Sequence, residues 1–281
     1  MNGIKCHLSR DEFRKILSEA IIKRLKSARR LGAPKIIARN LGGTMAKRLP
    51  AGSEHYTAYV GPPGQYDFMG ATQFRLLCTL GLREHHRLLD FGCGSLRAGR
   101  LFIPYLNPGH YYGVEPNQWL VEDAVKQEIG ADIIQIKKPT FLYHDTFTCR
   151  EFNVSFSYIL AQSIFTHAGD YNVHRCFEEF AACLDPKGIA AVTFIHAEAG
   201  EGDFDGTGWV YPDCVSYSPD TIQNLLRDAG LVGCEIPWYH PRQNWYVLSK
   251  SPARLPGSDE ARYLTGAVLF DPEFADSAQS S

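Results

Sequence analysis

The sequence contains no apolar run long enough to cross a membrane. Its longest apolar stretches, such as residues 158–161 and 189–195, fall well short of the roughly 20 residues that a spanning helix needs. The first residues alternate apolar positions with Lys and Arg and include Asp11 and Glu12, which is not typical of a secretory signal or an organelle presequence. We therefore expect a cytoplasmic protein without a membrane span.

Paired cysteine motifs are also absent. The eight cysteines are scattered singly, without a Cys-x-x-Cys pair and without the Cys/His spacing of a zinc site. No metal site is predicted, and the thiols are expected to be reduced and mostly to fill the core.

Charge is unevenly distributed along the chain. Residues 1–50 carry 13 Lys and Arg against 3 Asp and Glu, although the whole chain has 29 basic and 31 acidic side chains. From Ser9, apolar residues recur with the 3.6-residue period of a helix, which predicts a basic amphipathic helix. Aromatic residues are not interleaved with the basic ones, so we favour docking of this helix on the domain over membrane or nucleic-acid contact. A homodimer contact through the helix is a further possibility.

Downstream, short apolar segments alternate with helical patterns. The predicted strands are residues 87–90, 111–114, 140–143, 156–161, 189–195, 232–236 and 245–248. The predicted helices are residues 71–80, 95–106, 118–129, 171–184 and 219–229. This alternation predicts a doubly wound α/β fold, with a mostly parallel sheet of seven strands and helices on both faces. We expect a helical extension with a linker over residues 1–60, this domain over 61–250, and a loosely packed C-terminal tail over 251–281.

The most informative motif joins the first two strands. The first strand ends in Asp90 and is followed by Gly92 and Gly94, and the second strand ends about twenty residues later in Glu115. Two glycines permit a sharp turn from strand to helix that a ligand can approach closely. A carboxylate at the end of the second strand can accept hydrogen bonds from both ribose hydroxyls of a nucleoside.

A pyrophosphate-containing dinucleotide fits this motif poorly. The sixth position of a Gly-x-Gly-x-x-Gly pattern is Arg97, and the charge of Asp90 would repel a pyrophosphate. Asp90 and Glu115 together indicate a positively charged nucleoside. Taken singly, Asp90 has an ordinary alternative as a helix N-cap, and Glu115 as an exposed acid at a strand end.

These residues resemble the class I S-adenosylmethionine-dependent methyltransferases, and the likeness extends over roughly residues 65–248. The resemblance implies a Rossmann-like, doubly wound fold and a methyltransferase whose cofactor is S-adenosyl-L-methionine. Two positions depart from the family pattern, because Leu96 stands where a third glycine is frequent and Ser157 where an Asp is frequent. The cofactor-binding residues that the resemblance implies are Asp90, Gly92, Cys93, Gly94, Glu115, Pro116, Asn117, Asp145, Ala161 and Gln162. For Asp145, a simple turn role is an equally good interpretation.

Residues that follow the fourth and fifth strands are expected to face the methyl acceptor. Ligands bind outside the carboxyl ends of parallel strands, which places residues 162–167 at the cleft. His167 is the first candidate for the base that removes a hydroxyl proton, and His196 is the second. A structural hydrogen bond is the alternative for both histidines. His144 and His240 are possible substrate contacts.

Two loops are expected at the same edge of the sheet. The loop over residues 196–217 contains acids and aromatics, including Trp209 and Tyr211, that would select an amine or a polyhydroxylated acceptor. A solvated acidic loop is the alternative. The turn over residues 239–243 would join the last two strands, and it is interpreted either as closing the cleft or as a tight hairpin.

The sequence thus predicts an S-adenosylmethionine-dependent methyltransferase with a small-molecule acceptor, most simply an O-methyltransferase for a sugar or secondary metabolite. An RNA methyltransferase anchored by the basic helix is one alternative, which the acidic remainder of the chain disfavours. A non-catalytic S-adenosylmethionine-binding protein, in which the histidines are structural, is another.

Overall fold

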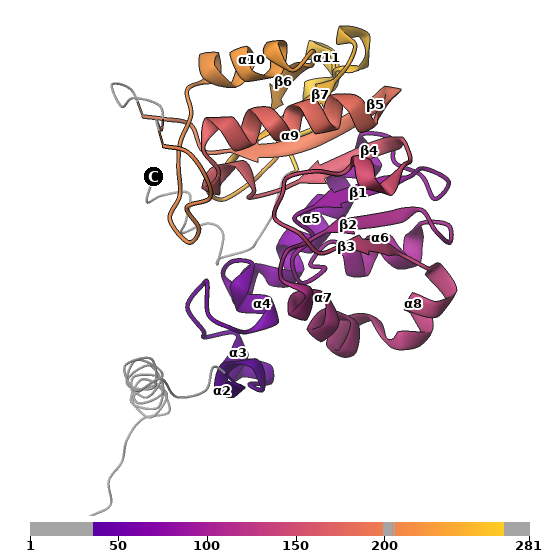
Figure 1. Cartoon of the computed structure of the whole chain (residues 1–281), viewed down its shortest axis with the longest axis vertical. Helices are drawn as coiled ribbons and strands as arrows, with labels where there is room; N and C mark the ends of the chain where they lie inside the picture. The colour runs from indigo at the N-terminus through magenta and orange to yellow at the C-terminus, as the bar shows by residue number, and fades with distance from the viewer. Residues whose placement is uncertain (1–35, 199–203, 205, 267–281) are drawn as a thin grey trace, which may run out of the picture. The chain divides into compact units, whose positions relative to one another are not determined.

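The computed structural model shows an α/β protein and describes residues 36–198, 204 and 206–266 (Figure 1). The basic helix predicted from Ser9 lies outside the described residues, as do several acids of the long loop, namely Glu201, Asp203 and Asp205. Among the described residues, no helix is both long and apolar enough to span a bilayer. The chain divides into two compact units between Tyr66 and Asp67.

The described part of the first unit consists of short helices. They are α2 (Ile36–Arg39), α3 (Gly43–Ala46), α4 (Tyr56–Tyr59) and the 3₁₀ turn η1 (Pro63–Gln65). The buried His55 links α4 to the turn between α2 and α3. Its Nδ1 accepts from the backbone N–H of Thr57 at 3.3 Å, which caps α4. Because Nδ1 accepts, the ring proton lies on Nε2, which donates to the carbonyl oxygen of Leu41 at 3.0 Å.

The second unit is built on a seven-stranded sheet. Its strands are β1 (Leu88–Phe91), β2 (Tyr111–Val114), β3 (Thr140–Leu142), β4 (Phe156–Ala161), β5 (Leu184–Phe194), β6 (Val232–Ile236) and β7 (Asn244–Ser249). Their order is β3-β2-β1-β4-β5-β7-β6, and β7 runs antiparallel to both of its neighbours while the other pairs are parallel. From β1 the chain adds β2 and β3 on one side of β1 and then crosses to add β4 on the other side. The boundary between β1 and β4 is therefore the topological switch point, where ligands bind in sheets of this kind. The predicted doubly wound, mostly parallel sheet is confirmed.

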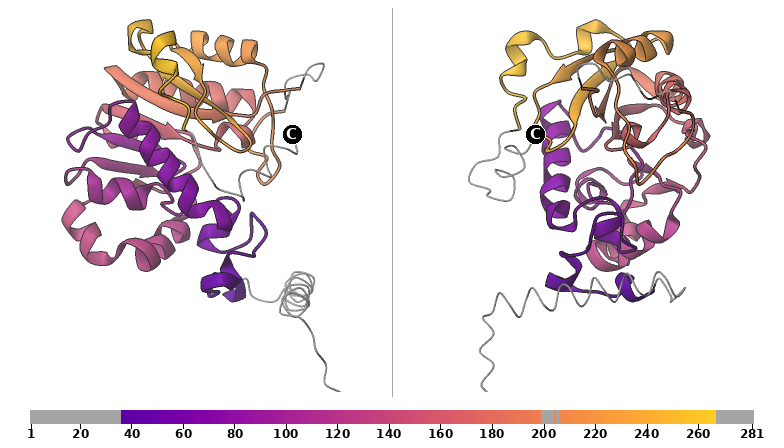
Figure 2. Two further views of the ribbon diagram at one scale, coloured as in Figure 1. Left: turned by 180° about the vertical axis from the view of Figure 1, so that it is seen from behind. Right: turned by 90° about the vertical axis from the view of Figure 1, so that its left-hand side faces the viewer.

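Helices cover both faces of this sheet. They are α5 (Tyr66–Thr79), α6 (Gly99–Tyr105), α7 (Gln118–Ala124) with a π-helical turn η2 (Val125–Ile129), α8 (Ala131–Lys137), α9 (Asp170–Cys183) and α10 (Pro219–Asp228). A further short helix, α11 (Ser258–Ala261), follows β7 and has no buried residue. Figure 1 shows α9 and α10 in front of the sheet, and the view from behind in Figure 2 shows α5 on the opposite face. α10 begins with Ser218 as its cap, whose hydroxyl oxygen accepts from the backbone N–H of Thr221 at 3.2 Å.

Alternating strand residues supply a core on each side. In β5, Val192 and Phe194 pack in the core that contains side chains of α9 and α10, whereas Ile189 and Ala191 pack in the core that contains side chains of α5 and α6. Because both sides of the strand are buried, β5 has an apolar run instead of an alternating pattern.

The helix after β1 begins later than the sequence predicts. A helix over residues 95–106 is expected, but α6 starts only at Gly99. The cause is Leu96, whose φ of +54° is left-handed and incompatible with a continuous right-handed helix. The whole of α8 is also missing from the prediction, because Gly130, with a φ of +88°, separates it from the preceding helix as a short element of its own.

Residues 251–266, the described part of the predicted loose tail, have packing contacts with the rest of the chain. Leu264 is buried, and the carbonyl oxygen of Thr265 accepts from the backbone N–H of Tyr239 at 3.0 Å. A Cβ on Gly266 would come within 2.9 Å of the Trp238 ring. The segment up to Gly266 therefore packs against the chain that follows β6.

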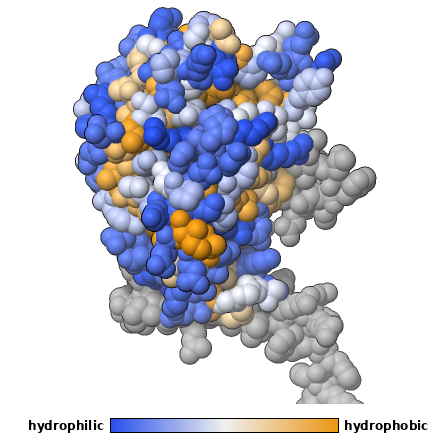
Figure 3. Space-filling view, turned by 90° about the vertical axis from the view of Figure 1, so that its right-hand side faces the viewer, coloured by the Kyte–Doolittle hydropathy of each residue, from blue (hydrophilic) through white to orange (hydrophobic). Residues whose placement is uncertain are grey.

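The surface is largely polar on the face that Figure 3 shows, with small, separate apolar patches. The large apolar side chains that are exposed in the described residues belong to different elements and are Met45, Ile136, Tyr143, Tyr171, Trp209 and Tyr263. Single exposed apolar residues of this kind are ordinary on a protein surface.

Candidate active site

The turn between β1 and α6 depends on its glycines. Gly92 has a φ of +74° and Gly94 a φ of +53°, and the backbone N–H groups of Gly92 and Cys93 both donate to the carbonyl oxygen of Val114, at 2.9 and 3.0 Å. A Cβ on Gly92 would lie only 2.0 Å from Cδ1 of Ile164. The turn therefore packs directly against the chain that follows β4, and a larger residue at position 92 would push the two apart.

Glu115 is fixed at this turn by three hydrogen bonds. Its Oε2 accepts from the backbone N–H of Gly94 at 3.0 Å, and its Oε1 accepts from the backbone and the side-chain nitrogen of Asn117, both at 2.8 Å. Burial raises the pKa of Glu115, and the three hydrogen bonds partly oppose this shift. Since an ionised carboxylate has about four acceptor positions, Oε2 retains one for a ligand hydroxyl. Pro116, next to it, is exposed.

Asp90 lies at the carboxyl end of β1, and its Oδ2 accepts from the Tyr111 hydroxyl at 2.7 Å. Its side chain is buried, and burial raises the pKa of Asp90 to about 6; the Tyr111 bond and the charge of Arg97 lower it, while the charge of Glu115 raises it further. A Cβ on Gly99 would approach the Tyr111 hydroxyl to 2.6 Å, so this glycine makes room for the bond. The motif alone gave no signal for Tyr111 or Gly99.

Three other predicted cofactor residues form no side-chain hydrogen bond with the glycine turn in the described part of the chain. The Cys93 side chain is buried in the core on the α6 side, so only its backbone is available at the turn. Asp145 is exposed in the segment after β3. Ala161 is fully buried as the last residue of β4, directly before Gln162.

Gln162 is contacted by the β6–β7 turn. The Gln162 amide faces Nε2 of His240 at 3.2 Å, and the Nδ1 of His240 accepts from the backbone N–H of Arg242 at 3.1 Å. Burial lowers the pKa of His240 to about 3, with the charges of Arg242 and Arg97 adding to the effect, so the ring is neutral. A neutral ring whose Nδ1 accepts carries its proton on Nε2, and the amide atom that faces it must then be the oxygen.

With the oxygen facing His240, the nitrogen of the Gln162 side-chain amide takes the other terminal position of the amide group. That position is buried and has no hydrogen-bond partner among the described residues. A buried amide without a partner is costly, so this position is open to a hydrogen bond with a ligand or an ordered water molecule. The turn over residues 239–243, which joins β6 to β7, thus contacts the residue that follows β4.

The residue after Gln162 has a strained backbone. Ser163 has a φ of +59°, and its backbone N–H donates to Oγ1 of Thr193 at 2.8 Å. The side-chain amide of Gln243 also donates to the Ser163 hydroxyl oxygen at 2.9 Å. Left-handed non-glycine residues are concentrated at functional sites. Ser163 and Gln243 lie within segments that the sequence places at the cleft, residues 162–167 and 239–243, but no role is predicted for either side chain. Thr193 was missed, although it is a polar position in an otherwise apolar part of β5.

His167 occupies a short 3₁₀ turn, η4 (Phe165–His167), and is buried. Its Nδ1 lies 2.6 Å from the carbonyl oxygen of Asp213, so Nδ1 carries the proton and donates it to this bond. Burial lowers the pKa of His167, and the bond to Asp213 partly opposes the shift. Trp209 and Tyr211 flank the ring, at 5.6 and 5.0 Å between centroids. The result is a neutral imidazole whose Nε2 lone pair has no hydrogen-bond partner among the described residues.

His196 has different neighbours. Its Nε2 lies 2.8 Å from the Tyr246 hydroxyl on β7 and 3.8 Å from Oε2 of Glu235 on β6. Both contacts hold the ring against the antiparallel strands. Nε2 is therefore the engaged nitrogen in His196, whereas in His167 it is the nitrogen without a partner among the described residues.

Comparison with known proteins defines the class of fold. No protein-family model matches the sequence, and no curated protein sequence is significantly similar to it. Solved structures do match, and those described below are methyltransferases. The chain has the fold of the class I S-adenosylmethionine-dependent methyltransferases, as the sequence predicts.

Three solved structures illustrate the likeness. The CcbJ methyltransferase from Streptomyces caelestis superposes with a TM-score of 0.51 at 13% identity, over 67% of this chain and 90% of that one. Magnesium protoporphyrin IX methyltransferase (ChlM) from Synechocystis PCC 6803, with bound SAH, gives 0.50 at 14% identity, over 67% and 84%. The glycopeptide N-methyltransferase MtfA, complexed with S-adenosyl-L-methionine, gives 0.50 at 12% identity, over 65% and 94%. At these identities the likeness concerns the fold.

Proposed function

We propose that this protein is an S-adenosylmethionine-dependent methyltransferase that acts on a hydroxyl group of a small molecule. One observation carries the proposal: two buried carboxylates, Asp90 and Glu115, meet a glycine turn at the carboxyl ends of adjacent strands. Neither carboxylate forms an ion pair with a Lys or Arg side chain in the described part of the chain. Such a site favours a cation and repels the pyrophosphate of a dinucleotide.

The residues present fit the two polar ends of S-adenosyl-L-methionine. The Asp90 carboxylate would bind the ammonium group, and the free acceptor position of Glu115 would bind a ribose hydroxyl. The unpartnered amide of Gln162 gives a further polar contact at the same edge. When bound, this cofactor supplies an electrophilic methyl group on a sulfonium.

His167 would act as the base. Its Nε2 is the proton acceptor for a substrate hydroxyl, because Nδ1 is already committed to the carbonyl of Asp213. The same carbonyl stabilises the positive charge that develops on the ring when the proton arrives. Trp209 and Tyr211, stacked at 6.3 Å with an interplanar angle of 22°, cover the ring and help to exclude water.

The aromatic surface supports a planar or sugar-like acceptor. Trp209 is 48% exposed, so part of its ring is available to stack on a planar or sugar-like molecule. An RNA acceptor would need a basic groove, and the basic N-terminal segment on which that alternative rests lies outside the described residues.

Calorimetric titration with S-adenosyl-L-methionine tests the cofactor assignment. We expect binding near one equivalent, weakened at least about tenfold by Glu115→Gln, because a neutral amide accepts more weakly than a carboxylate. Glu122→Gln, at an exposed position on α7, is the matched control and should bind normally. Absence of binding by the unmodified protein would refute the proposal.

Transfer of a labelled methyl group tests the reaction. The protein is incubated with tritium-labelled cofactor and with phenols, sugars, amines or RNA. His167→Gln should keep cofactor binding and lose about 10²- to 10⁴-fold in turnover, whereas His174→Gln, on a solvent-facing part of α9, should lose none. Label in RNA would support the alternative enzyme, and intact binding with no transfer to any acceptor would indicate a non-catalytic binder.

A further inference from the structure

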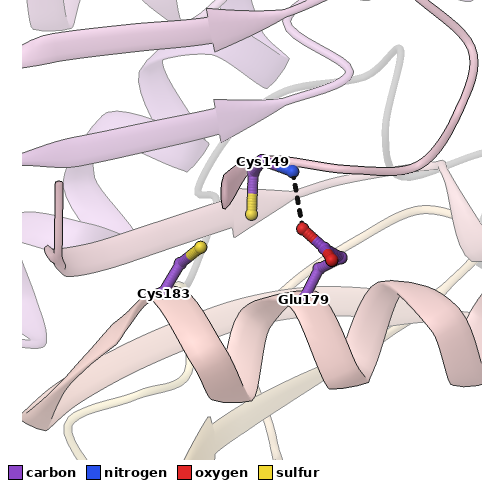
Figure 4. Close-up of side chains that lie close together, drawn as sticks. All are labelled: Cys149, Glu179 and Cys183. Carbon is purple, nitrogen blue, oxygen red and sulfur yellow. Dashed lines mark hydrogen bonds between the residues drawn. The ribbon is translucent and has the colours of Figure 1, made fainter. Parts of the chain in front are cut away.

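Two cysteines that are distant in the sequence face each other in the fold (Figure 4). Cys149 precedes the 3₁₀ turn η3 (Arg150–Phe152) between β3 and β4, and Cys183 is the last residue of α9. Their Sγ atoms and a carboxylate oxygen of Glu179 all lie within 4.8 Å of one another, and all three residues are buried. The thiols are free, and this site is separate from the proposed active site.

The carboxylate in this cluster already has its partners. Oε2 of Glu179 accepts from the backbone N–H groups of Cys149 and Arg150, at 2.9 and 3.2 Å, and Oε1 pairs with Nε of Arg150 at 2.9 Å. A metal ion would have to compete with the Arg150 guanidinium for this carboxylate. Glu179 therefore attaches the loop to α9 and brings the two sulfur atoms together, and the thiols are the groups left to react.

The two thiols are not equivalent. The hydrogen bond from Cys149 lowers the pKa of Cys183, and the charges of Arg150 and Lys250 lower it further, while burial and Glu179 oppose the shift. The same hydrogen bond and burial raise the pKa of Cys149. Of the two thiols, Cys183 is thus the one that ionises more readily. A nucleophilic thiolate beside a protonated thiol is the arrangement in which a sulfenic acid is resolved as a disulfide.

We propose that Cys149 and Cys183 form an oxidation site that closes to a disulfide when the protein meets a peroxide. The Cys183 thiolate attacks one oxygen of hydrogen peroxide, the O–O bond breaks, and hydroxide leaves, so that Cys183 becomes a sulfenic acid. The Cys149 sulfur then displaces the hydroxyl group from the Cys183 sulfur, and the Cys149 proton leaves with it as water. The hydroxide released in the first step takes up the proton that Cys183 lost on ionising, so two thiols are oxidised to a disulfide and one hydrogen peroxide is reduced to two molecules of water.

The disulfide would fix one end of the β3–β4 loop to α9. Earlier in the same loop, Phe147 lies 5.9 Å from Trp209 and 6.4 Å from Phe91 between ring centroids. The cross-link would therefore restrain a loop that reaches the aromatic residues around His167.

Peroxide treatment of the full chain, followed by alkylation of the remaining thiols and peptide mass mapping, tests the proposal. We expect a cross-linked peptide pair containing Cys149 and Cys183, two hydrogens lighter than the reduced pair and released by dithiothreitol. The cross-linked protein should melt about 5 to 10 °C higher than the reduced protein. Cys176→Ser, fully buried on the same helix, is the control and should keep the cross-link, whereas Cys183→Ser should lose it.

The unmodified protein alone can overturn the proposal, so the result does not depend on how the variants fold. Oxidation of the exposed Cys214 while Cys149 and Cys183 stay open to alkylation after unfolding would contradict it. Sulfinic acid at Cys183 without a cross-link would contradict it as well. Stoichiometric zinc that must be chelated before either thiol reacts would assign the cluster to a metal instead.

Discussion

Replacing Asp90 by Asn should make the protein more stable and its cofactor binding weaker. Asp90 is buried, and its pKa rises from an ordinary value of 3.8 to about 6 because burial disfavours the charged form. A shift of that size means that ionising Asp90 costs about 3 kcal/mol more in the folded protein than in the unfolded chain. Asn has nearly the same shape, carries no charge, and can still accept from the Tyr111 hydroxyl.

The pH dependence of this effect has a defined sign. The folded protein holds the Asp90 proton more tightly than the unfolded chain, so this group stabilises the fold below about pH 3.8 and loses that contribution as the pH rises through about 6. The Asn variant has no such group. Its advantage in free energy of unfolding should be small near pH 4 and should approach about 3 kcal/mol above about pH 7.

Urea denaturation at about pH 4.5 and about pH 7.5, without cofactor, measures this difference. Asp145→Asn, at an exposed position, is the control and should change the unfolding free energy by less than about 0.5 kcal/mol at either pH. Equal stability of the Asp90→Asn protein and the unsubstituted protein at the higher pH, or an advantage that does not grow with pH, would refute the reasoning. The same Asp90→Asn protein should bind S-adenosyl-L-methionine about 10- to 100-fold more weakly, since the ammonium group loses its ionic partner.

Three further predictions concern the turn, the base and a helix cap. Gly92→Ala should lower the free energy of unfolding measured in urea by about 2 to 4 kcal/mol, because a positive φ and the 2.0 Å approach to Ile164 both oppose a Cβ. Gly109→Ala, where φ is +76° but the space is open, should lower it by only about 1 kcal/mol. Equal losses would show that the Ile164 side chain moves aside at little cost. At saturating cofactor, turnover should stay constant as the pH falls through 6.5 and decline only below it, because burial holds the pKa of His167 under its ordinary value; a decline centred above pH 6.5 would point to another base. Ser218→Ala should lower the unfolding free energy by about 1 kcal/mol through loss of the α10 cap, and an unchanged value would mean that the cap contributes nothing.

Most strand positions were predictable because the relevant signal is local. β2, β4 and β6 begin and end where the sequence predicts, since strands appear as short apolar or β-branched segments between turn residues. The start of α6 was not predictable in this way. The left-handed conformation of Leu96 follows from how the turn packs between strands, and leucine itself has no preference for it.

The site residues also separate into those that a local pattern predicts and those that it does not. Asp90, Glu115 and the glycines could be predicted because they lie within one β-α-β unit and their spacing is fixed by its geometry. The contacts between Gln162 and His240 and between Ser163 and Gln243 join segments that are distant in the sequence. No local pattern encodes such pairs.

The cysteines are another case in which the sequence does not predict a contact between distant segments. Their single, scattered positions predict separate thiols, and the described thiols are indeed free. Only the packing of α9 against the segment after β3 brings Cys149 and Cys183 together. Reactivity between two side chains is therefore a property of the folded molecule.

The position of β7 determines when, during synthesis, the proposed cofactor site can be complete. This strand is late in the sequence but is inserted between β5 and β6, and the turn that leads into it delivers His240 and Gln243 to the end of β4. During synthesis, a nascent chain that has emerged only as far as α10 would possess the glycine turn and both acids but not the side chains that orient Gln162 and Ser163. Cofactor binding would thus require that the β6–β7 hairpin has packed against β5. Stabilisation of the fold by bound cofactor would then be confined to chains whose synthesis has passed β7.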